Sequence, residues 1–269
     1  MPFFIRSLVV LIFVVHSLPI TAQLSPPGLD NTNTVLWTAL GINQNIGTKW
    51  FNQSYIGFSR CSDPNNNALL SKQAIYVVEQ QTYRKFGSHW QLGFCLSLRG
   101  QNMYSDDPPY ESENPALRRE IRYYLRLFYR HQYHRFSFAY SLRPEWRNFY
   151  NPDWSNYYSS PKALRYRIKG QVGFAVGQSK KGSIILANEL LFVQQEQRQP
   201  TGDLTWSQLT WTEDRIATYY RYTLPKKRMV VDIGMMQQLN FKNGSFVSNF
   251  VHLAFDVLFI DPFGKRKNQ

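Results

Sequence analysis

The sequence predicts an all-β protein, an up-and-down antiparallel transmembrane β-barrel of about 10–12 strands. Three observations predict this fold class. Apolar and polar side chains alternate with a period of two, the alternating segments are long, and short turns alternate with long polar loops. The 269 residues are 43% hydrophobic, which is enough to form a core and excludes a disordered chain. The mean hydropathy of −0.41 excludes a bundle of membrane helices.

The N-terminus has the features of a secretory signal peptide. Arg6 is the only charge in residues 1–22, Leu8 to Val15 are apolar, and Thr21-Ala22 form a small-residue end. The apolar stretch is shorter than the roughly 20 residues that span a bilayer. We therefore expect cleavage, with an uncleaved signal anchor as the alternative. The predicted organisation is a signal peptide at 1–22, a barrel at 23–260 and a basic C-terminal tail at 261–269.

Eleven segments show the alternation. In the clearest one, Trp90, Leu92 and Phe94 fall on one face and Gln91, Gly93 and Cys95 on the other. The segments are 33–46, 49–60, 68–86, 89–101, 118–133, 134–147, 163–178, 182–195, 211–224, 227–241 and 246–260. They reach the roughly 9–11 residues of a tilted membrane strand, whereas globular strands average about 5–6. Because bacterial barrels normally have an even strand number, we expect 10 or 12 strands rather than eleven.

The connections between these segments are of two kinds. Short turns are predicted at 46–49, 87–88, 134, 179–182 and 225–226. Long polar loops are predicted at 61–67, 102–117, 148–162 and 196–210. Short connections at one end and long ones at the other are typical of outer-membrane barrels, in which the long loops lie outside the cell.

The energetics of charge predict which face meets lipid. An arginine that faces lipid at the bilayer midplane costs about 2–4 kcal/mol, so the charged faces should line the lumen. The predicted lumen-facing residues are Arg122, Arg126, Arg130, Arg143, Arg165, Arg167, Glu189, Arg215, Arg221 and Asp232. This lining has two interpretations: a basic channel that favours anions, or arginines and glutamates that pair and fill the lumen. The candidates for aromatic girdles at the membrane surfaces are Trp50, Trp90, Tyr129, Tyr133, Trp211 and Tyr222.

Several short motifs resemble a known family. They are Leu164-Arg165-Tyr166-Arg167-Ile168, Ala187-Asn188-Glu189 followed by apolar residues, Glu213-Asp214-Arg215 and Gly234-Met235. In this order they resemble the domain-of-unknown-function family numbered 2490, exported proteins thought to be outer-membrane barrels. The resemblance implies a fold and a membrane, and it implies no activity. Such barrels commonly end on an aromatic residue that the assembly machinery recognises. Here Phe259 would be that residue, and it is followed by Ile260 and the basic tail at 261–269.

The reactive residues show no catalytic or metal-binding pattern in the sequence. His252 and Asp256 share a face but lie four residues apart, about 13 Å along a strand. A diagonal contact between His252 and Asp232 is a candidate, either as a catalytic pair or as a structural hydrogen bond. His131 falls on an apolar face, where interfacial packing is expected. The two cysteines, Cys61 and Cys95, have no zinc-ligand spacing and could be paired or free. We predict no catalytic residue, no metal and no cofactor.

These observations lead to three functional hypotheses. The first is a non-enzymatic outer-membrane barrel, either a narrow pore or a structural and surface-interaction protein. The others are a lipid-modifying outer-membrane enzyme and a soluble periplasmic ligand-binding barrel. The expected partners are outer-membrane lipid, lipopolysaccharide and the barrel-assembly machinery. Nucleic acid is not expected, because the excess of 31 basic over 18 acidic residues is spread among the strands.

Overall fold

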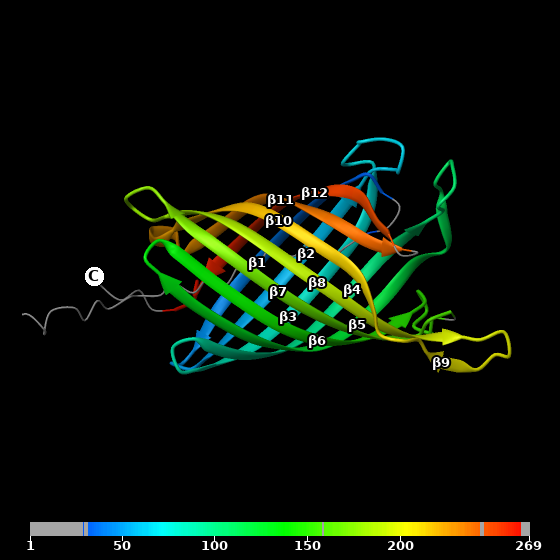
Figure 1. Ribbon diagram of the computed structural model, residues 1–269, viewed down its shortest axis with the longest axis horizontal. Coiled ribbons are helices and arrows are strands. Elements are labelled where there is room, and N and C mark those ends of the chain that lie inside the picture. Colours follow the sequence, from blue (N-terminus) through cyan, green and yellow to red (C-terminus); the bar gives the residue numbers. More distant parts are fainter. Residues whose placement is uncertain (1–28, 30–31, 158, 243–244, 265–269) are drawn as a thin grey trace, which may run out of the picture.

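The computed structural model describes residue 29 and residues 32–157, 159–242 and 245–264; the side chains of 242–251 are not described. Figure 1 shows an elongated β-barrel with strongly tilted strands. Within these residues the helical structure is one 3₁₀ turn, Pro225–Lys227, and no helix is long and apolar enough to cross a membrane. The predicted signal peptide lies outside the described residues, as does most of the predicted tail.

The described residues contain twelve strands. They are β1 (Thr34–Ile46), β2 (Trp50–Cys61), β3 (Lys72–Phe86), β4 (Trp90–Tyr104), β5 (Ser112–Tyr133), β6 (Phe136–Tyr150), β7 (Lys162–Val176), β8 (Gly182–Arg198), β9 (Leu204–Trp206), β10 (Thr210–Leu224), β11 (Met229–Lys242) and β12 (Ser245–Ile260). Eleven of them form the wall of the barrel. The short β9 pairs only with the end of β8, at Glu196–Arg198, in the long connection to β10.

The barrel closes with an odd number of strands. From β1 to β8, and then through β10, β11 and β12, each strand pairs antiparallel with the next. The barrel closes where β12 pairs with β1 in parallel, from Thr34 opposite Val251 to Asn43 opposite Ile260. The expectation of 10 or 12 strands was wrong, and the eleven segments counted in the sequence were the eleven strands. Bacterial outer-membrane barrels usually have an even number of strands. Geometrically, an odd number needs only one parallel pair, which places the start of β1 and the end of β12 at opposite ends of the barrel.

The connections confirm the predicted asymmetry. Short turns join β1–β2, β3–β4, β5–β6, β7–β8 and β10–β11 at one end, which we call the turn end. The long connections after β2, β4, β6 and β8 lie at the other end, which we call the loop end (Figure 1). The main difference is in β4 and β5, whose pairing continues to Tyr104 opposite Ser112. The long polar loop predicted at 102–117 is therefore shorter, because its two ends continue the pairing of β4 and β5.

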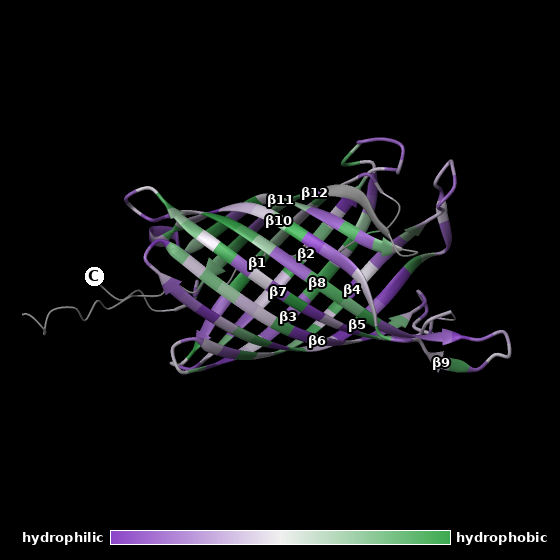
Figure 2. Cartoon of the chain, viewed as in Figure 1, coloured by the Kyte–Doolittle hydropathy of each residue, from purple (hydrophilic) through white to green (hydrophobic). Residues whose placement is uncertain are grey.

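The two faces of the wall differ in polarity. On β5 the outward Leu125 is 48% exposed, whereas its neighbour Arg126 is 7% exposed and points into the barrel. The apolar residues Leu92 and Phe255 are likewise exposed, at 42% and 40%. Figure 2 shows the resulting stripes of hydrophobic and hydrophilic residues along the strands. The barrel is therefore built inside out relative to a water-soluble protein, with bulky apolar groups outside and charge inside.

The outer face also has a polar area on β2 and β3. Here Thr82 donates a hydrogen bond to Asn52 Oδ1 at 2.9 Å, and Ser54 donates one to Gln80. These side chains satisfy one another across neighbouring strands, which lowers the cost of placing them in an apolar medium. The outer face is therefore apolar with local exceptions, and it is not the unbroken apolar surface that the alternation predicts.

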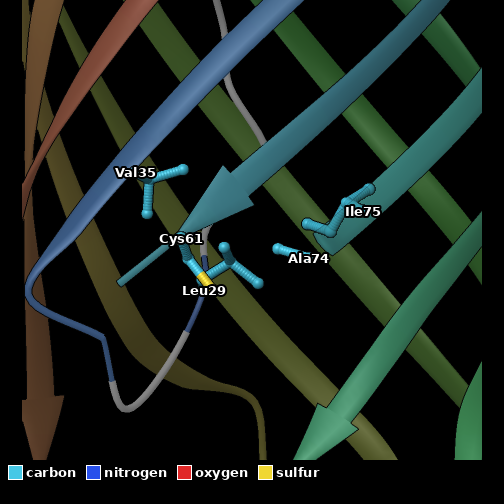
Figure 3. Packing of buried hydrophobic residues seen from close by; sticks show 5 residues of the cluster. All are labelled: Leu29, Val35, Cys61, Ala74 and Ile75. Atoms are coloured by element: carbon cyan, nitrogen blue, oxygen red, sulfur yellow. The ribbon is translucent and has the colours of Figure 1, made fainter. Parts of the chain in front are cut away.

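The loop end of the interior contains a small apolar core. Leu29 packs there with Val35 on β1, Cys61 on β2, and Ala74 and Ile75 on β3 (Figure 3). Val35 and Ile75 are completely buried. Both cysteines of the chain, Cys61 here and Cys95 on β4, are buried and free, which settles the pairing that the sequence left open.

Glycines on the wall allow aromatic rings to lie flat inside the barrel. A Cβ atom at Gly41 would lie 2.4 Å from the ring of Tyr55 on the next strand, and one at Gly93 would lie 2.4 Å from the ring of Tyr83. Both glycines are directly opposite these tyrosines in the register. The rings therefore pack against the bare backbone of the neighbouring strand.

Candidate luminal site

The structure places nine of the ten predicted lumen residues in the buried interior. They are Arg122, Arg126, Arg143, Arg165, Arg167, Glu189, Arg215, Arg221 and Asp232, each at most 7% exposed. The tenth, Arg130, is half-buried nearer the turn end. There its Nη2 donates a hydrogen bond to Gln91 Oε1 at 3.1 Å, and its guanidinium lies over the ring of Phe128.

Glu145 on β6 is the centre of the charged interior. Its carboxylate is fully buried and accepts hydrogen bonds from Arg143 beside it and from Arg165 Nε at 2.6 Å. Arg167 Nη1 lies 3.4 Å from the same carboxylate, and Arg122 Nε lies 3.8 Å from it. Four arginines on three neighbouring strands therefore converge on one glutamate.

Glu120 on β5 extends this network toward the loop end. It accepts a hydrogen bond from Arg122 Nε at 3.0 Å and from Arg147 Nε at 2.6 Å, and Arg99 Nε lies 3.9 Å away. Arg147 was not predicted as a site residue, because it fell at the last position of its predicted segment. The continued alternation of Arg143, Glu145 and Arg147 was the signal that would have found it.

Glu189 on β8 extends the network in the other direction around the wall. It accepts a hydrogen bond from Arg167 Nη2 at 2.8 Å and lies 3.6 Å from Arg215 Nη1. Arg215 in turn contacts Glu213 at 2.5 Å. Among the described residues this continuous network joins seven arginines to four glutamates: Arg99, Arg122, Arg143, Arg147, Arg165, Arg167 and Arg215 with Glu120, Glu145, Glu189 and Glu213.

A second charged group lies on β10, β11 and β12. Arg221 donates two hydrogen bonds to Asp232, at 2.8 and 2.7 Å, in the bidentate geometry typical of strong arginine–carboxylate pairs. Asp232 is directly opposite Asp256 in the register. The Oδ1 atom of Asp256 is buried, and none of the described residues provides it with a hydrogen-bond partner.

Apolar side chains cross the interior beside these charges. Trp37 on β1 packs with Ile185 on β8, Tyr219 on β10 and Ala254 on β12. Val77 on β3 packs against the same cluster, which therefore extends across the interior from β3 to β8. Nearer the turn end, the rings of Phe51 and Tyr83 stack with centroids 4.9 Å apart. Long side chains therefore fill much of the lumen, as expected for a barrel of this strand number.

A cavity of about 100 Å³ lies in the middle of the lumen. One part of its wall, from β4 to β10, is formed by arginines: Arg99, Arg122, Arg126, Arg143, Arg165, Arg167 and Arg215. The rest, from β12 to β3, is formed mainly by uncharged residues that include Trp37, Tyr55, Val77 and Gln81, together with Asp256 and Glu79. The cavity is therefore strongly asymmetric in charge.

The histidines do not form the catalytic arrangement that was considered. His252 is opposite Met236, not Asp232, and Asp232 lies four register positions, about 13 Å, farther along the strand. The proposed diagonal contact was therefore wrong. His131 stacks on Phe138 with ring centroids 4.7 Å apart, in agreement with the predicted packing role. No group of three or more His, Cys, Asp or Glu side chains among the described residues is placed to hold a metal ion.

The loop between β6 and β7, which contains Trp154 and Tyr157, folds onto the rim of the barrel at the loop end. Trp154 lies under the guanidinium of Arg119, 4.6 Å from the ring centroid, and next to the ring of Tyr150. The loop is held by hydrogen bonds from the Ser155 hydroxyl and backbone N–H to Asp153, which also hold the pKa of that carboxyl below its usual range. Trp154 is still 52% exposed, so it remains available for contact.

Comparison with known proteins adds no relationship to this picture. No family model matches the chain, and no curated protein matches it.

Proposed function

We propose that this protein is an outer-membrane β-barrel without enzymatic activity, whose lumen is closed by its own side chains and which has a structural or surface-interaction role. The observation that carries the proposal is the inverted distribution of polarity. Leu186, Phe94 and Ile56 are more than half exposed on the outer face, whereas the arginine–glutamate network is buried. The proposal includes export by the N-terminal signal, membership of family 2490, assembly by the barrel machinery, and contact with outer-membrane lipid and lipopolysaccharide.

The area of exposed apolar surface supports a lipid environment. Large apolar side chains are exposed on every strand of the wall, whereas the largest apolar patch on a typical soluble monomer covers a few hundred Å². A soluble binding barrel, the alternative hypothesis, would instead have an apolar interior. The interior described above is lined mainly by arginine and glutamate, which argues against that alternative.

Aromatic residues near both ends of the strands have the spacing of membrane girdles. On β10, Trp211 and Tyr222 are both exposed and lie eleven residues apart. That separation is about 37 Å along a strand, or about 26–30 Å along the barrel axis at the tilt of about 35–45° usual for such barrels. The apolar band of an outer-membrane barrel is about 25 Å tall. At the turn end, Trp90 packs against Tyr129, and Trp50 and Tyr133 are also exposed.

A narrow pore for anions is the second candidate function. The charged network contains three more arginines than glutamates, which would favour anions over cations in any continuous path. The packing of Trp37 across the lumen favours the closed barrel instead.

Conductance in planar bilayers separates the two candidates. We expect the wild-type barrel, with insertion shown by flotation with lipid vesicles, to give no steady conductance. Replacing Trp37 by alanine removes a large side chain from the lumen and is expected to produce small, anion-selective openings. Steady anion-selective current from the wild type would overturn the closed barrel in favour of the pore, and recovery of the protein away from lipid would overturn both.

A further inference from the structure

We propose that the central luminal cavity is a binding site for one small oxyanion, a phosphate or a carboxylate, held by its arginine wall. The inference deepens the anion-pore candidate by naming what the lumen binds. It needs only the interior of the barrel, so a barrel that never conducts can still have this site.

The charge balance of the interior calls for an additional anion. The seven arginines and four glutamates of the network leave three positive charges in excess, within a region where these side chains are nearly all buried. Buried charge is costly unless it is paired and hydrogen-bonded. The cavity lining adds one arginine, Arg126, and two carboxylates, Glu79 and Asp256, to the charges of this network, so two positive charges remain in excess. An anion in the cavity would offset this excess.

Two arginines of the cavity wall have hydrogen-bonding capacity left. The Nε atoms of Arg99 and Arg167 are buried, and none of the described residues gives either of them a hydrogen-bond partner. Guanidinium groups match oxyanions especially well, because their N–H donors are arranged in a planar fork. The strands β4 and β7 that carry these two residues belong to the same arginine-rich part of the wall.

The cavity selects for a small ligand. A volume of about 100 Å³ holds several water molecules, since one water needs about 10–15 Å³ measured in this way. A compact oxyanion such as phosphate takes the same space. The side of the cavity opposite the arginines includes Trp37, Tyr55 and Val77, which offer an apolar surface to the body of a small organic acid. Two probes therefore distinguish the two sources of the anion. Phosphate represents an inorganic or headgroup phosphate, and a small aromatic carboxylate represents a small organic acid.

Calorimetric titration of the folded barrel in a zwitterionic detergent tests the site. Sodium phosphate and sodium benzoate are titrated separately, with sodium chloride at matched ionic strength as the reference. We expect one anion to bind with a stoichiometry of one per barrel, and chloride to bind much more weakly. Tighter binding of phosphate would identify an inorganic or headgroup phosphate, and tighter binding of benzoate a small organic acid.

Two variants assign the binding to the cavity. Arg99→Gln removes one of the available donors and one positive charge, and we expect affinity to fall at least fivefold. Asp256→Asn leaves every arginine in place and, at alkaline pH where the Asp256 carboxyl is ionised, removes a negative charge from the lining, so affinity measured there should rise by about fivefold. Arg119→Gln on the outer face is the matched control and should leave affinity unchanged.

The result that overturns the proposal is the absence of saturable binding by either probe in the folded wild type. Equal affinity in the wild type and in Asp256→Asn at alkaline pH would also overturn it, and that comparison decides if Arg99→Gln does not fold. Folding is checked by resistance to detergent denaturation before heating. Because this experiment needs no bilayer, its failure is distinct from the failure of the conductance test.

Discussion

Replacing Glu145 by glutamine is expected to lower the free energy of unfolding by about 3–5 kcal/mol, the cost of removing one partner from a buried ion pair. The carboxylate is fully buried, and Arg143, Arg165, Arg167 and Arg122 all lie within 4 Å of it. A neutral amide would leave these guanidinium groups close together without their shared counter-charge. Loss of this one charge should therefore have a larger effect than loss of any single arginine around it.

Urea unfolding of the barrel in lipid vesicles measures this effect. The matched control is Glu111→Gln, at an exposed position in the loop before β5 where the backbone carbonyl accepts the hydrogen bond of Ser105. We expect the control to stay within about 0.5 kcal/mol of the wild type, as is usual for surface substitutions. A Glu145→Gln variant as stable as the control would show that the arginine network does not depend on this carboxylate.

Replacing Leu125 by arginine is expected to cost about 2–4 kcal/mol when the barrel folds into a bilayer, the usual cost of arginine at the midplane of a lipid-facing surface. Leu125 lies in the middle of β5 and is 48% exposed on the outer face. The substitution breaks no side-chain hydrogen bond, because leucine has none, and the side chain points away from the lumen. Its cost is therefore a direct measure of the medium outside the barrel.

The position of the arginine along the strand provides the control. Tyr133 lies at the turn end of the same strand and is 65% exposed, so Tyr133→Arg should cost only about 0–1 kcal/mol near the interface. Both variants are compared by equilibrium folding into vesicles. If Leu125→Arg changed stability by no more than Tyr133→Arg, the outer face would be in water and the membrane assignment would be wrong.

The strands could be predicted from the sequence because their alternation is local. The segment predicted at 182–195 is β8 at Gly182–Arg198, and the one predicted at 211–224 is β10 at Thr210–Leu224. Closure of the barrel could not be predicted in this way. The parallel pairing of β1 with β12 joins residues more than 200 positions apart, such as Trp37 and Ala254, and no local pattern specifies it. The three-residue β9 is too short to show a period.

The faces of the candidate site were predictable, but its pairings were not. Alternation placed Arg122 and Arg126 on the same face, and the cost of charge in lipid indicated which face that was. The convergence of Arg165 and Arg167 on Glu145 depends on the register between β6 and β7, which only the folded sheet sets. Asp232 and Asp256 lie directly opposite each other on β11 and β12, but they are 24 positions apart in the sequence. Their pairing could therefore not be predicted from the sequence either.

Nitroxide accessibility along β4 tests the central claim most directly, namely that the outer face of the barrel meets lipid. Spin labels are placed one at a time at the outward positions Leu92, Phe94, Leu96 and Leu98 and at the inward positions Cys95 and Ser97. Cys61 is replaced in every variant, and Cys95 in every variant except the one labelled there. The account predicts high access to oxygen and low access to a water-soluble nickel complex at the four outward positions, and low access to oxygen at the two inward ones. Free access of the nickel complex to the outward positions in vesicles would contradict it.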